Sequence, residues 1–299
     1  MSVLTHRILL VSDMHYAIQE DKHEYMRKYP GSNPAEAYGN AYQYTQKEKI
    51  QRVFSDISKE NSRSPLDAVL ILGDMSLDDY GTRNLHQNFC EKFKEECLDK
   101  LTVPYYVIPG NHDSYPEETW RELFGTGREY VLELCDSVFV MGDTFKGTVH
   151  NGPSAPLDTI DETMLTDALE KYKGKKIFIC AHHVRDEAFT EKCRKLVSES
   201  DDVICMFRGH THINRILEFC GKKVFDIGGY AYNGKMVNGK YDACIYDFAW
   251  AWGYQILEIY DDKVKTYHVK PAMHYEGTNG SFEVSGDTVE DTTEFILNN

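Results

Sequence analysis

Polar side chains that can bind metal follow five apolar segments of this 299-residue chain. A buried core does not tolerate unpartnered Asp, Asn or His, whereas the carboxyl end of a strand can present them to a ligand. The segments and their polar groups are Arg7–Val11 with Asp13 and His15, Asp67–Leu72 with Asp74, Val103–Ile108 with Asn111, His112 and Asp113, Ile177–Ala181 with His182 and His183, and Val203–Phe207 with His210 and His212. The recurrence of one pattern predicts a metal site.

The candidate ligands offer oxygen and nitrogen atoms and no thiolate. That mixture suits Mn, Fe, Zn or Co better than Ca, whose sites consist of oxygen atoms. Seven ligands are too many for one ion with an open position, but they suit two ions that share a carboxylate. Two-metal sites hold their ions about 3.5–4 Å apart and clamp both oxygens of an in-line displacement. Asp13 and His15 would point the same way in extended backbone, so we expect both to reach one ion.

The segments that must position these groups alternate between strands and helices, which predicts an α/β fold. Ile50, Val53, Phe54 and Ile57 recur at helical spacing, and similar patterns predict further helices between the strands. Apolar strands that end in polar groups predict a largely parallel sheet with the site along its carboxyl edge. Antiparallel strands of a second sheet are predicted at Lys223–Ile227, Ala243–Phe248, Tyr254–Tyr260 and Lys263–Val269. We expect one domain over residues 1–299.

Two segments differ in amino-acid composition from the rest of the chain. Residues 16–44 are polar and rich in tyrosine, with Pro-Gly and Asn-Pro breaks. Loops this long are uncommon in a compact domain and are often functional, so we predict a cap insertion; the alternative is a surface insertion packed against its own scaffold. Residues 275–299 are acidic and rich in Thr and Gly, which predicts a loose C-terminal tail with one strand at Phe282–Val284.

Composition limits the partners and the compartment. The net charge of −15 disfavours an extended nucleic acid, although bound metal ions reverse the sign locally for a small phosphate ester. No apolar run approaches the roughly 18 residues that a membrane span needs. The first strand begins within a few residues of Met1 and leaves no room for a signal peptide. The eight cysteines show no CxxC pair, which favours reduced thiols and a cytoplasmic protein.

Taken in chain order, the polar groups resemble the five motifs of the calcineurin-like metallophosphoesterase superfamily. The motifs are Asp13-x-His15, Gly73-Asp74, Gly110-Asn111-His112-Asp113, His182, and Gly209-His210-Thr211-His212. Each motif is weak evidence alone, but five in order at strand ends are specific. They span residues 8–212. The resemblance implies a four-layer αββα sandwich, with two mixed sheets flanked by helices, and hydrolysis of phosphate mono- or diesters.

The same resemblance implies a role for each motif residue. The implied ligands are Asp13, His15 and His212 for the first metal, Asn111, His182 and His210 for the second, and Asp74 for both. A metal-bound hydroxide would be the nucleophile, because a metal can lower the pKa of water to around 7. His112 would protonate the leaving oxygen or stabilise the developing charge. Asp113 would support a neighbouring ligand.

The chain departs from the family pattern at two places. The protein-phosphatase branch has Asp-Arg-Gly shortly after its Gly-Asp, whereas Gly73-Asp74 is followed by Met-Ser-Leu-Asp, which disfavours a Ser/Thr protein phosphatase. Many relatives have His-x-Pro at the fourth motif, whereas this chain has His182-His183-Val184. The first histidine of that pattern is the ligand, which corresponds to His182. Neighbouring side chains in extended backbone point to opposite faces, so we expect His183 to support a ligand or contact phosphate.

The favoured function is a dinuclear-metal hydrolase of small phosphate esters, either a phosphodiesterase or a phosphomonoesterase. One alternative is a binding scaffold, as in the retromer subunit that resembles these phosphatases and has lost catalytic histidines; the retention of His112 argues against it. Another is a nuclease of the double-strand-break repair type, which the net charge disfavours. We expect a small phosphorylated substrate as partner, and neither a nucleic-acid tract nor a membrane.

Overall fold

Two mixed sheets of six strands each form the centre of the computed structural model, which describes residues 2–16, 46–76, 89–146, 157–230, 233–237, 240–244, 253–277 and 280–297. The first sheet has the order β16 (Thr288–Ile296), β13 (Lys263–Lys270), β12 (Tyr254–Tyr260), β1 (Leu4–Val11), β2 (Ala68–Leu72) and β3 (Tyr105–Ile108). The second has the order β4 (Tyr130–Leu134), β5 (Ser137–Gly142), β6 (Lys176–Ala181), β7 (Val203–Arg208), β9 (Lys222–Ile227) and β8 (Asn214–Phe219). Neighbours are parallel from β1 to β3 and from β5 through β9, and antiparallel elsewhere.

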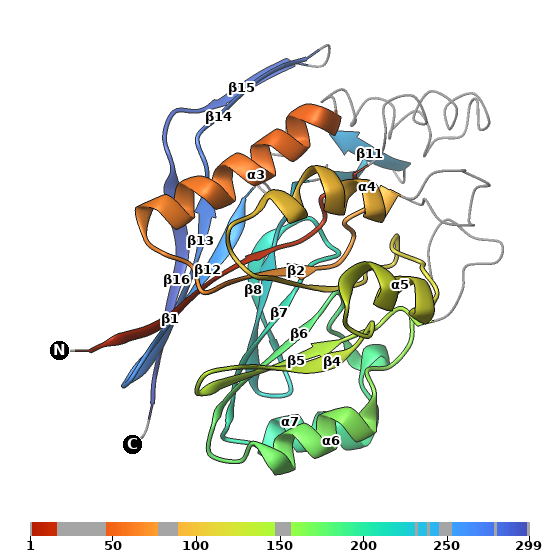
Figure 1. Cartoon of the computed structure of the whole chain (residues 1–299), viewed down its shortest axis with the longest axis vertical. Helices are drawn as coiled ribbons and strands as arrows, with labels where there is room; N and C mark the ends of the chain where they lie inside the picture. Colours follow the sequence, from red (N-terminus) through yellow and green to blue (C-terminus); the bar gives the residue numbers. More distant parts are fainter. Residues whose placement is uncertain are drawn as a thin grey trace.

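Helices cover the outer face of each sheet (Figure 1). Those over the first sheet are α3 (Gln46–Arg63), α4 (Phe89–Glu96) and α5 (Glu117–Phe124), and those over the second are α6 (Glu162–Lys171) and α7 (Glu191–Glu199). Two short 3-10 helices occupy Leu98–Lys100 and Asp186–Ala188. Two of the apolar residues at helical spacing, Val53 and Ile57, lie on the inner face of α3 and are buried against the first sheet.

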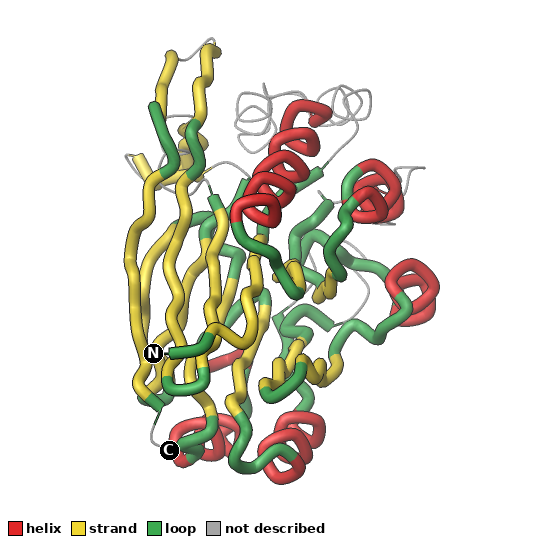
Figure 2. Tube along the Cα trace, turned by 60° about the vertical axis from the view of Figure 1, so that its left-hand side comes forward, coloured by secondary structure: helices red, strands yellow, loops and turns green. Residues whose placement is uncertain are grey.

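Alternation of side chains along the strands builds three hydrophobic layers. In β1, Leu9 and Val11 pack with the helices α3 to α5, while Ile8 and Leu10 pack with side chains of the second sheet. Strand β5 shows the same alternation between the interior layer and the layer beneath α6 and α7. Three apolar layers between four layers of secondary structure confirm the predicted αββα sandwich. Figure 2 shows the long strands of the first sheet side by side.

The loops that carry the polar motifs meet at one edge of both sheets. The loop after β1 runs beside the loop after β2, because the N–H groups of Asp13 and His15 donate to the carbonyl oxygens of Gly73 (3.0 Å) and Asp74 (2.9 Å). In the second sheet, the N–H of Gly209 after β7 donates to the carbonyl of His182 after β6 at 3.2 Å, and between the sheets the N–H of His210 donates to Oδ2 of Asp13 at 2.9 Å. The carboxyl ends of parallel strands therefore converge as predicted.

The predicted strand Phe282–Val284 lies within β15 (Gly280–Val284), and the segment expected to be a loose tail after it contains a further strand. Strand β14 (Met273–Gly277) pairs with β15 (Gly280–Val284), and β16 is an edge strand of the first sheet paired with β13. Figure 2 shows the β14–β15 hairpin extending beyond that sheet. The side chains of β16 are mostly exposed or half-buried, and Thr293 is the buried one among them. A strand of this kind lacks the buried alternation that would reveal it in a sequence.

Other expectations fall partly or wholly outside the described residues. The predicted cap insertion lies outside them except for Tyr16, and the predicted strand Ala243–Phe248 overlaps β11 (Lys240–Cys244), which pairs with β10 (Asn233–Val237). The cysteines whose side chains are described are free thiols. Within the described part of the chain, no helix has the length and apolar content needed to cross a membrane.

Candidate metal centre

The backbone is left-handed at five of the seven predicted ligands. Among the described non-glycine residues, positive φ values occur at Asp13 (54°), His15 (46°), Asp74 (51°), His210 (73°) and His212 (54°). Few other described residues share this conformation, and Asp and His tolerate it better than most side chains. The extended backbone assumed in the sequence analysis is therefore wrong at residues 13 and 15. Tight turns, rather than strand alternation, bring these side chains together.

One glycine allows the loops to approach one another. Gly73 has a φ of 90°, and a Cβ built on it would lie 2.6 Å from both the Gly110 nitrogen and Nδ1 of His182. Separations that short do not occur for real Cβ atoms. The Gly-Asp motif therefore needs glycine for its backbone conformation and for the space that His182 occupies.

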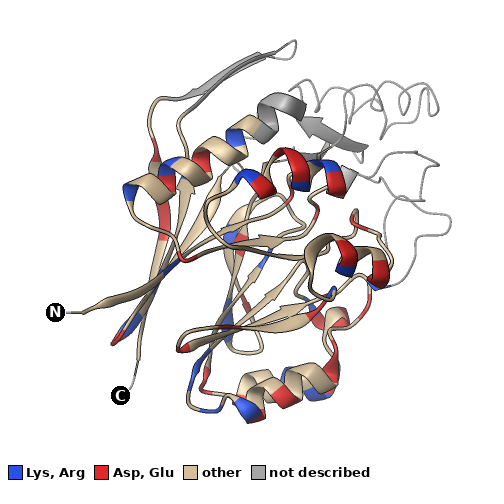
Figure 3. Ribbon diagram, in the orientation of Figure 1, with Lys and Arg blue, Asp and Glu red and all other residues tan. Residues whose placement is uncertain are grey.

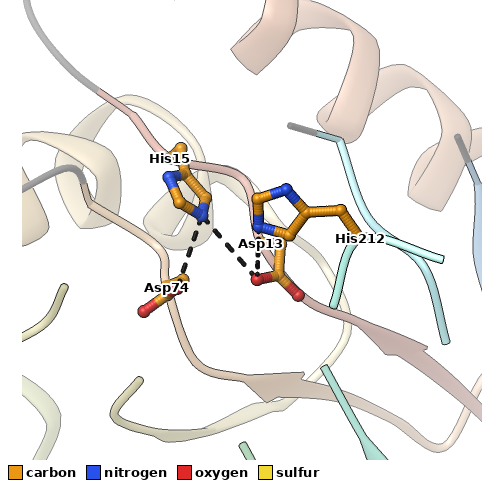
Figure 4. Close-up of side chains that lie close together, drawn as sticks. All are labelled: Asp13, His15, Asp74 and His212. Atoms are coloured by element: carbon orange, nitrogen blue, oxygen red, sulfur yellow. Dashed lines mark ion pairs between the residues drawn. The ribbon is translucent and has the colours of Figure 1, made fainter. Parts of the chain in front are cut away.

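Four buried residues form the first group of candidate ligands, which we call group one: Asp13, His15, Asp74 and His212. Their ligand atoms all lie within 4.8 Å of one another. Figure 4 shows His15 and His212 reaching the Asp13 carboxylate from different sides. Nε2 of His212 lies 3.1 Å from Oδ1 of Asp13, and Nε2 of His15 lies 3.7 Å from that oxygen and 3.3 Å from Oδ2 of Asp74.

Group two shares Asp74 with group one and adds ligands from the second sheet. Asp74, His182 and His210 bring their ligand atoms within 4.8 Å of one another, and Nε2 of His182 lies 3.1 Å from Oδ2 of Asp74. Asn111 completes the group, with Oδ1 lying 3.2 Å from Nε2 of His182 and 2.8 Å from Nδ1 of His210. The two groups together contain every predicted ligand, and Asp74 is the residue they have in common.

Contacts beyond the ligand atoms fix the orientation of His182. Its Nδ1 lies 2.7 Å from the carbonyl oxygen of Leu72, which requires a proton on Nδ1 and directs Nε2 toward Asp74 and Asn111. Metal-binding histidines typically use the second ring nitrogen in this way. His183 instead lies against His210, with ring centroids 4.4 Å apart, and its N–H donates to the Thr144 hydroxyl. Both rings lie near His210, but only His182 directs a ring nitrogen toward Asp74 and Asn111.

The charges at the site are those of ionised carboxylates among histidines. Burial alone would raise the pKa of Asp13 and Asp74, but neighbouring His212 and His182 respectively lower it below its usual range. Burial would lower the pKa of His182, whereas Asp74 raises it to about 9. Burial, together with the charge of His182, lowers the pKa of His210 to about 3. A cation at this position would take the place of the proton on His182.

The residues fit two metal ions. Each group supplies at least one carboxylate and two imidazoles, and Oδ1 of Asp13 is buried without a hydrogen-bond donor of good geometry. Buried carboxylates usually have several donors or a cation beside them. The oxygen and nitrogen donors suit Mn, Fe, Zn or Co. The dinuclear interpretation therefore agrees with the chemistry of the atoms that converge.

His112 and Asp113 lie beside the ligands but belong to neither ligand group. The His112 N–H donates to Oδ1 of Asp74 at 2.9 Å, and its ring centroid lies 4.8 Å from that of His15. The Asp113 carboxylate accepts from the N–H groups of Met75 (3.2 Å), Ser76 (3.0 Å) and Gly110 (3.0 Å). It thereby connects the loop that carries Asp74 to the loop that carries Asn111.

Sequence reasoning missed two residues that shape the site. The Phe145 ring lies 5.6 Å from that of His182 and 5.5 Å from that of His210, so it packs on group two. Asp226 accepts from the Thr211 hydroxyl at 2.6 Å and from Arg208 at 2.9 Å, which holds the turn between His210 and His212. The segment around Phe145 has no pattern that would single it out. Asp226 interrupts an apolar strand, which is a signal that was available.

Comparisons with known proteins agree with this arrangement. The sequence profile of the family described as calcineurin-like phosphoesterase matches residues 6–214. A probable glycerophosphodiester phosphodiesterase GpdQ from Arcobacter nitrofigilis is 25% identical over 173 residues, which cover 51% of this chain and 59% of the relative. The chain thus matches about three-fifths of that protein's length.

Comparison with solved structures gives matches at low sequence identity. GAP50, the anchor in the inner membrane complex of Plasmodium, is 12% identical with a TM-score of 0.50, and the match covers 95% of this chain and 90% of that chain. Vacuolar Protein Sorting 29 from Cryptosporidium parvum is 15% identical with a TM-score of 0.37, over 99% of this chain and 100% of that chain.

Proposed function

Since the chain belongs to the calcineurin-like phosphoesterase family, we propose that it is a dinuclear-metal hydrolase of small phosphate esters, with phosphodiesters as its preferred substrates. The observation that carries the proposal is the pair of ligand groups that share Asp74. A shared carboxylate between two ions is the arrangement that clamps the attacking and leaving oxygens of an in-line displacement. The similarity to a probable glycerophosphodiester phosphodiesterase favours diesters over monoesters.

Each residue has a role in this proposal. Asp13, His15 and His212 hold the first metal, Asn111, His182 and His210 hold the second, and Asp74 holds both. When bound, the ions supply Lewis-acid activation of water and neutralise charge on the phosphoryl oxygens. His112, fixed to Asp74 through its backbone N–H, donates a proton to the leaving oxygen. Asp113 keeps the Asp74 and Asn111 loops together.

The two alternatives are less well supported. A scaffold would not require seven converging ligands, six of them buried and five in a left-handed backbone conformation that costs free energy. A nuclease would need a basic surface for the phosphate backbone. In Figure 3, acidic residues are interspersed with basic ones along α4 and α6, and lysines such as Lys92 and Lys94 pair with acidic neighbours. The net charge of −15 points the same way.

Hydrolysis by the Mn-loaded protein tests the proposal. The substrates are bis-p-nitrophenyl phosphate, p-nitrophenyl phosphate, glycerophosphodiesters and a panel of cyclic nucleotides. We expect faster turnover of diesters than of the monoester, and loss of activity after chelation with recovery on adding Mn. A protein that holds two metal equivalents and hydrolyses none of these esters would instead support the scaffold.

His112→Asn tests the role of the acid. Metal content should be unchanged, because His112 is not a ligand, while turnover should fall by roughly 10²–10⁴-fold, as for other losses of acid–base catalysis. The fall should be smaller for nitrophenyl esters, whose leaving groups need less protonation. Equal losses for alkyl and nitrophenyl esters would contradict the assignment.

A further inference from the structure

A single buried guanidinium connects the loops at the ends of two sheets. Arg128 lies between α5 and β4 and is 6% exposed. Its Nη1 donates to the carbonyl oxygens of Asp113 (3.2 Å) and Tyr115 (2.5 Å), both in the loop after β3 of the first sheet. Its Nε donates to Oδ2 of Asp143 (2.8 Å) and its Nη2 to the carbonyl of Phe145 (3.0 Å), both in the loop after β5 of the second sheet.

The two connected loops carry parts of the site that must act together. The loop after β3 holds His112, directly before Asp113. The loop after β5 holds Phe145, whose ring packs on His182 and His210 of group two. Asp143 also accepts a hydrogen bond from the Phe145 N–H at 2.8 Å. This bond closes the turn from Asp143 to Phe145, and Arg128 binds both of these residues. His112 thus follows a strand of the first sheet, whereas His182 and His210 of group two follow strands of the second sheet.

We propose that Arg128 is a positioning residue, which holds His112 in register with His182 and His210, the ligands of group two that follow strands of the second sheet. The inference rests on the proposed function, because register between an acid and the metal ligands matters only to a hydrolase. Reacting groups must be held at near-attack distances, and a misplacement of about 1 Å can cost roughly 10²-fold in rate. Arg128 touches neither a ligand side chain nor the His112 ring in these contacts, so it acts through the two loops.

The chemistry of the guanidinium explains why this position holds arginine. Four acceptors on two loops surround it, and one face lies 5.7 Å from the Trp120 ring. Arginine presents five N–H donors in a planar, rigid fork, whereas lysine has one compact ammonium on a flexible stem. A lysine can pair with Asp143 but cannot reach both loops at once. Arg128→Lys therefore keeps the charge and removes the connection.

Kinetics of Arg128→Lys in two backgrounds test this role. In the wild-type background, kcat should fall by roughly 10²-fold with little change in KM and with two metal equivalents retained. In the His112→Asn background, the same substitution should have much less effect, because the acid it positions is already absent. The matched control is Arg121→Lys, an exposed arginine paired with Glu117 on α5, which should leave kcat unchanged.

Two kinetic outcomes would overturn the inference. One is an unchanged kcat in Arg128→Lys, and the other is an equal loss in both backgrounds, which would mean that Arg128 acts independently of His112. If the wild-type protein hydrolyses no ester, the proposed function fails instead, and the inference is then decided by hydrogen exchange.

Amide hydrogen exchange on the metal-free protein gives a readout that does not depend on activity. Arg128→Lys should accelerate exchange in residues 110–115 and 143–146 together, and leave β6 as protected as in the wild type. Acceleration in one segment only would contradict a connection between the loops. Asp143→Asn is the second variant if Arg128→Lys does not fold, because it removes the carboxylate that accepts from Nε. It should produce the same His112-dependent loss of kcat.

Discussion

At the scale of single residues, most of the ligands have a backbone conformation that few other described non-glycine residues adopt. Left-handed backbone costs a non-glycine residue roughly 1–2 kcal/mol, somewhat less for Asp, and five ligands adopt it. Strain of this kind persists where the surroundings over-determine the conformation, and it concentrates at functional sites. Here the surroundings are the close loops around Gly73 and the hydrogen bonds from the loop after β1 to the loop after β2.

Asp74→Asn should be the most damaging ligand substitution, since one carboxylate belongs to both groups. We expect bound metal, measured by plasma mass spectrometry after dialysis, to fall well below two equivalents, with activity lost in parallel. Asp136→Asn, at a largely exposed turn, is the control and should bind as the wild type does. Two retained equivalents with normal activity would show that Asp74 does not bridge.

Substitutions of the adjacent histidines His182 and His183 should differ in their effect on metal binding. His182→Ala should lose the second metal, because Nε2 of His182 faces Asp74 and Asn111. His183→Ala should bind both metals, since His183 belongs to neither group of converging ligands. Titrating metal into each variant after chelation measures the difference. The reverse result would move the ligand assignment by one residue.

At this scale the sequence predicted which residues meet but not how. The predicted ligands converge because polar groups at strand ends share one sheet edge. The left-handed turns were not predicted, because Asp and His occur in several backbone conformations and only the tertiary contacts select one. Arg128 and Phe145 were missed for a related reason: their contacts join loops that are distant in sequence.

At the scale of elements, the turn after β2 allows a test of whether its backbone must approach His182 closely for metal to bind. Gly73→Ala adds a Cβ 2.6 Å from Nδ1 of His182 at a φ of 90°, so we expect displacement of His182 and loss of the second metal. Gly174→Ala is the matched control, because Gly174 has a φ of 84° and nothing within 4 Å of the added Cβ. The control should cost about 1–2 kcal/mol in the free energy of unfolding and keep both metals.

Chemical denaturation and metal analysis of both glycine variants separate the effect of the backbone conformation on stability from the effect of the added Cβ on His182 and metal binding. If Gly73→Ala binds two equivalents and loses no more stability than Gly174→Ala, the space beside His182 is not limiting.

The elements that the sequence predicted well are those with a buried face. Strand β12 coincides with the predicted Tyr254–Tyr260, and α3 has the predicted apolar stripe. Among the strands that were missed, β8 and β16 are edge strands whose side chains are mostly exposed or half-buried. Their position depends on backbone pairing with β9 and β13 rather than on burial. Hydrophobic periodicity reports burial, so it does not detect them.

At the scale of the whole molecule, metal binding should stabilise the fold, because the ligands come from both sheets. Binding to the folded state alone contributes about 2.7 kcal/mol at a metal concentration 100-fold above Kd. For a chain of this size we expect Tm to rise by roughly 5–10 °C when Mn is added to the metal-free protein. Calorimetry with and without chelator measures the shift.

Two variants check the origin of that thermal shift. His112→Asn should keep it, because His112 is not a ligand, and Asp74→Asn should lose most of it. An equal rise in Tm for Asp74→Asn would show that Mn binds elsewhere.

The order of strands in the first sheet has a consequence for synthesis on the ribosome. Strand β1 lies inside that sheet, between β2 and β12, and its pairing with β12 joins Leu4 to Tyr260. The strands of the second sheet all lie between residues 130 and 227, so they emerge before β12 does. Until then one edge of β1 has no strand to pair with, and open edges recruit other chains. A nascent chain stalled before residue 254 is therefore the form of this protein most exposed to aggregation, and the form for which a chaperone matters most.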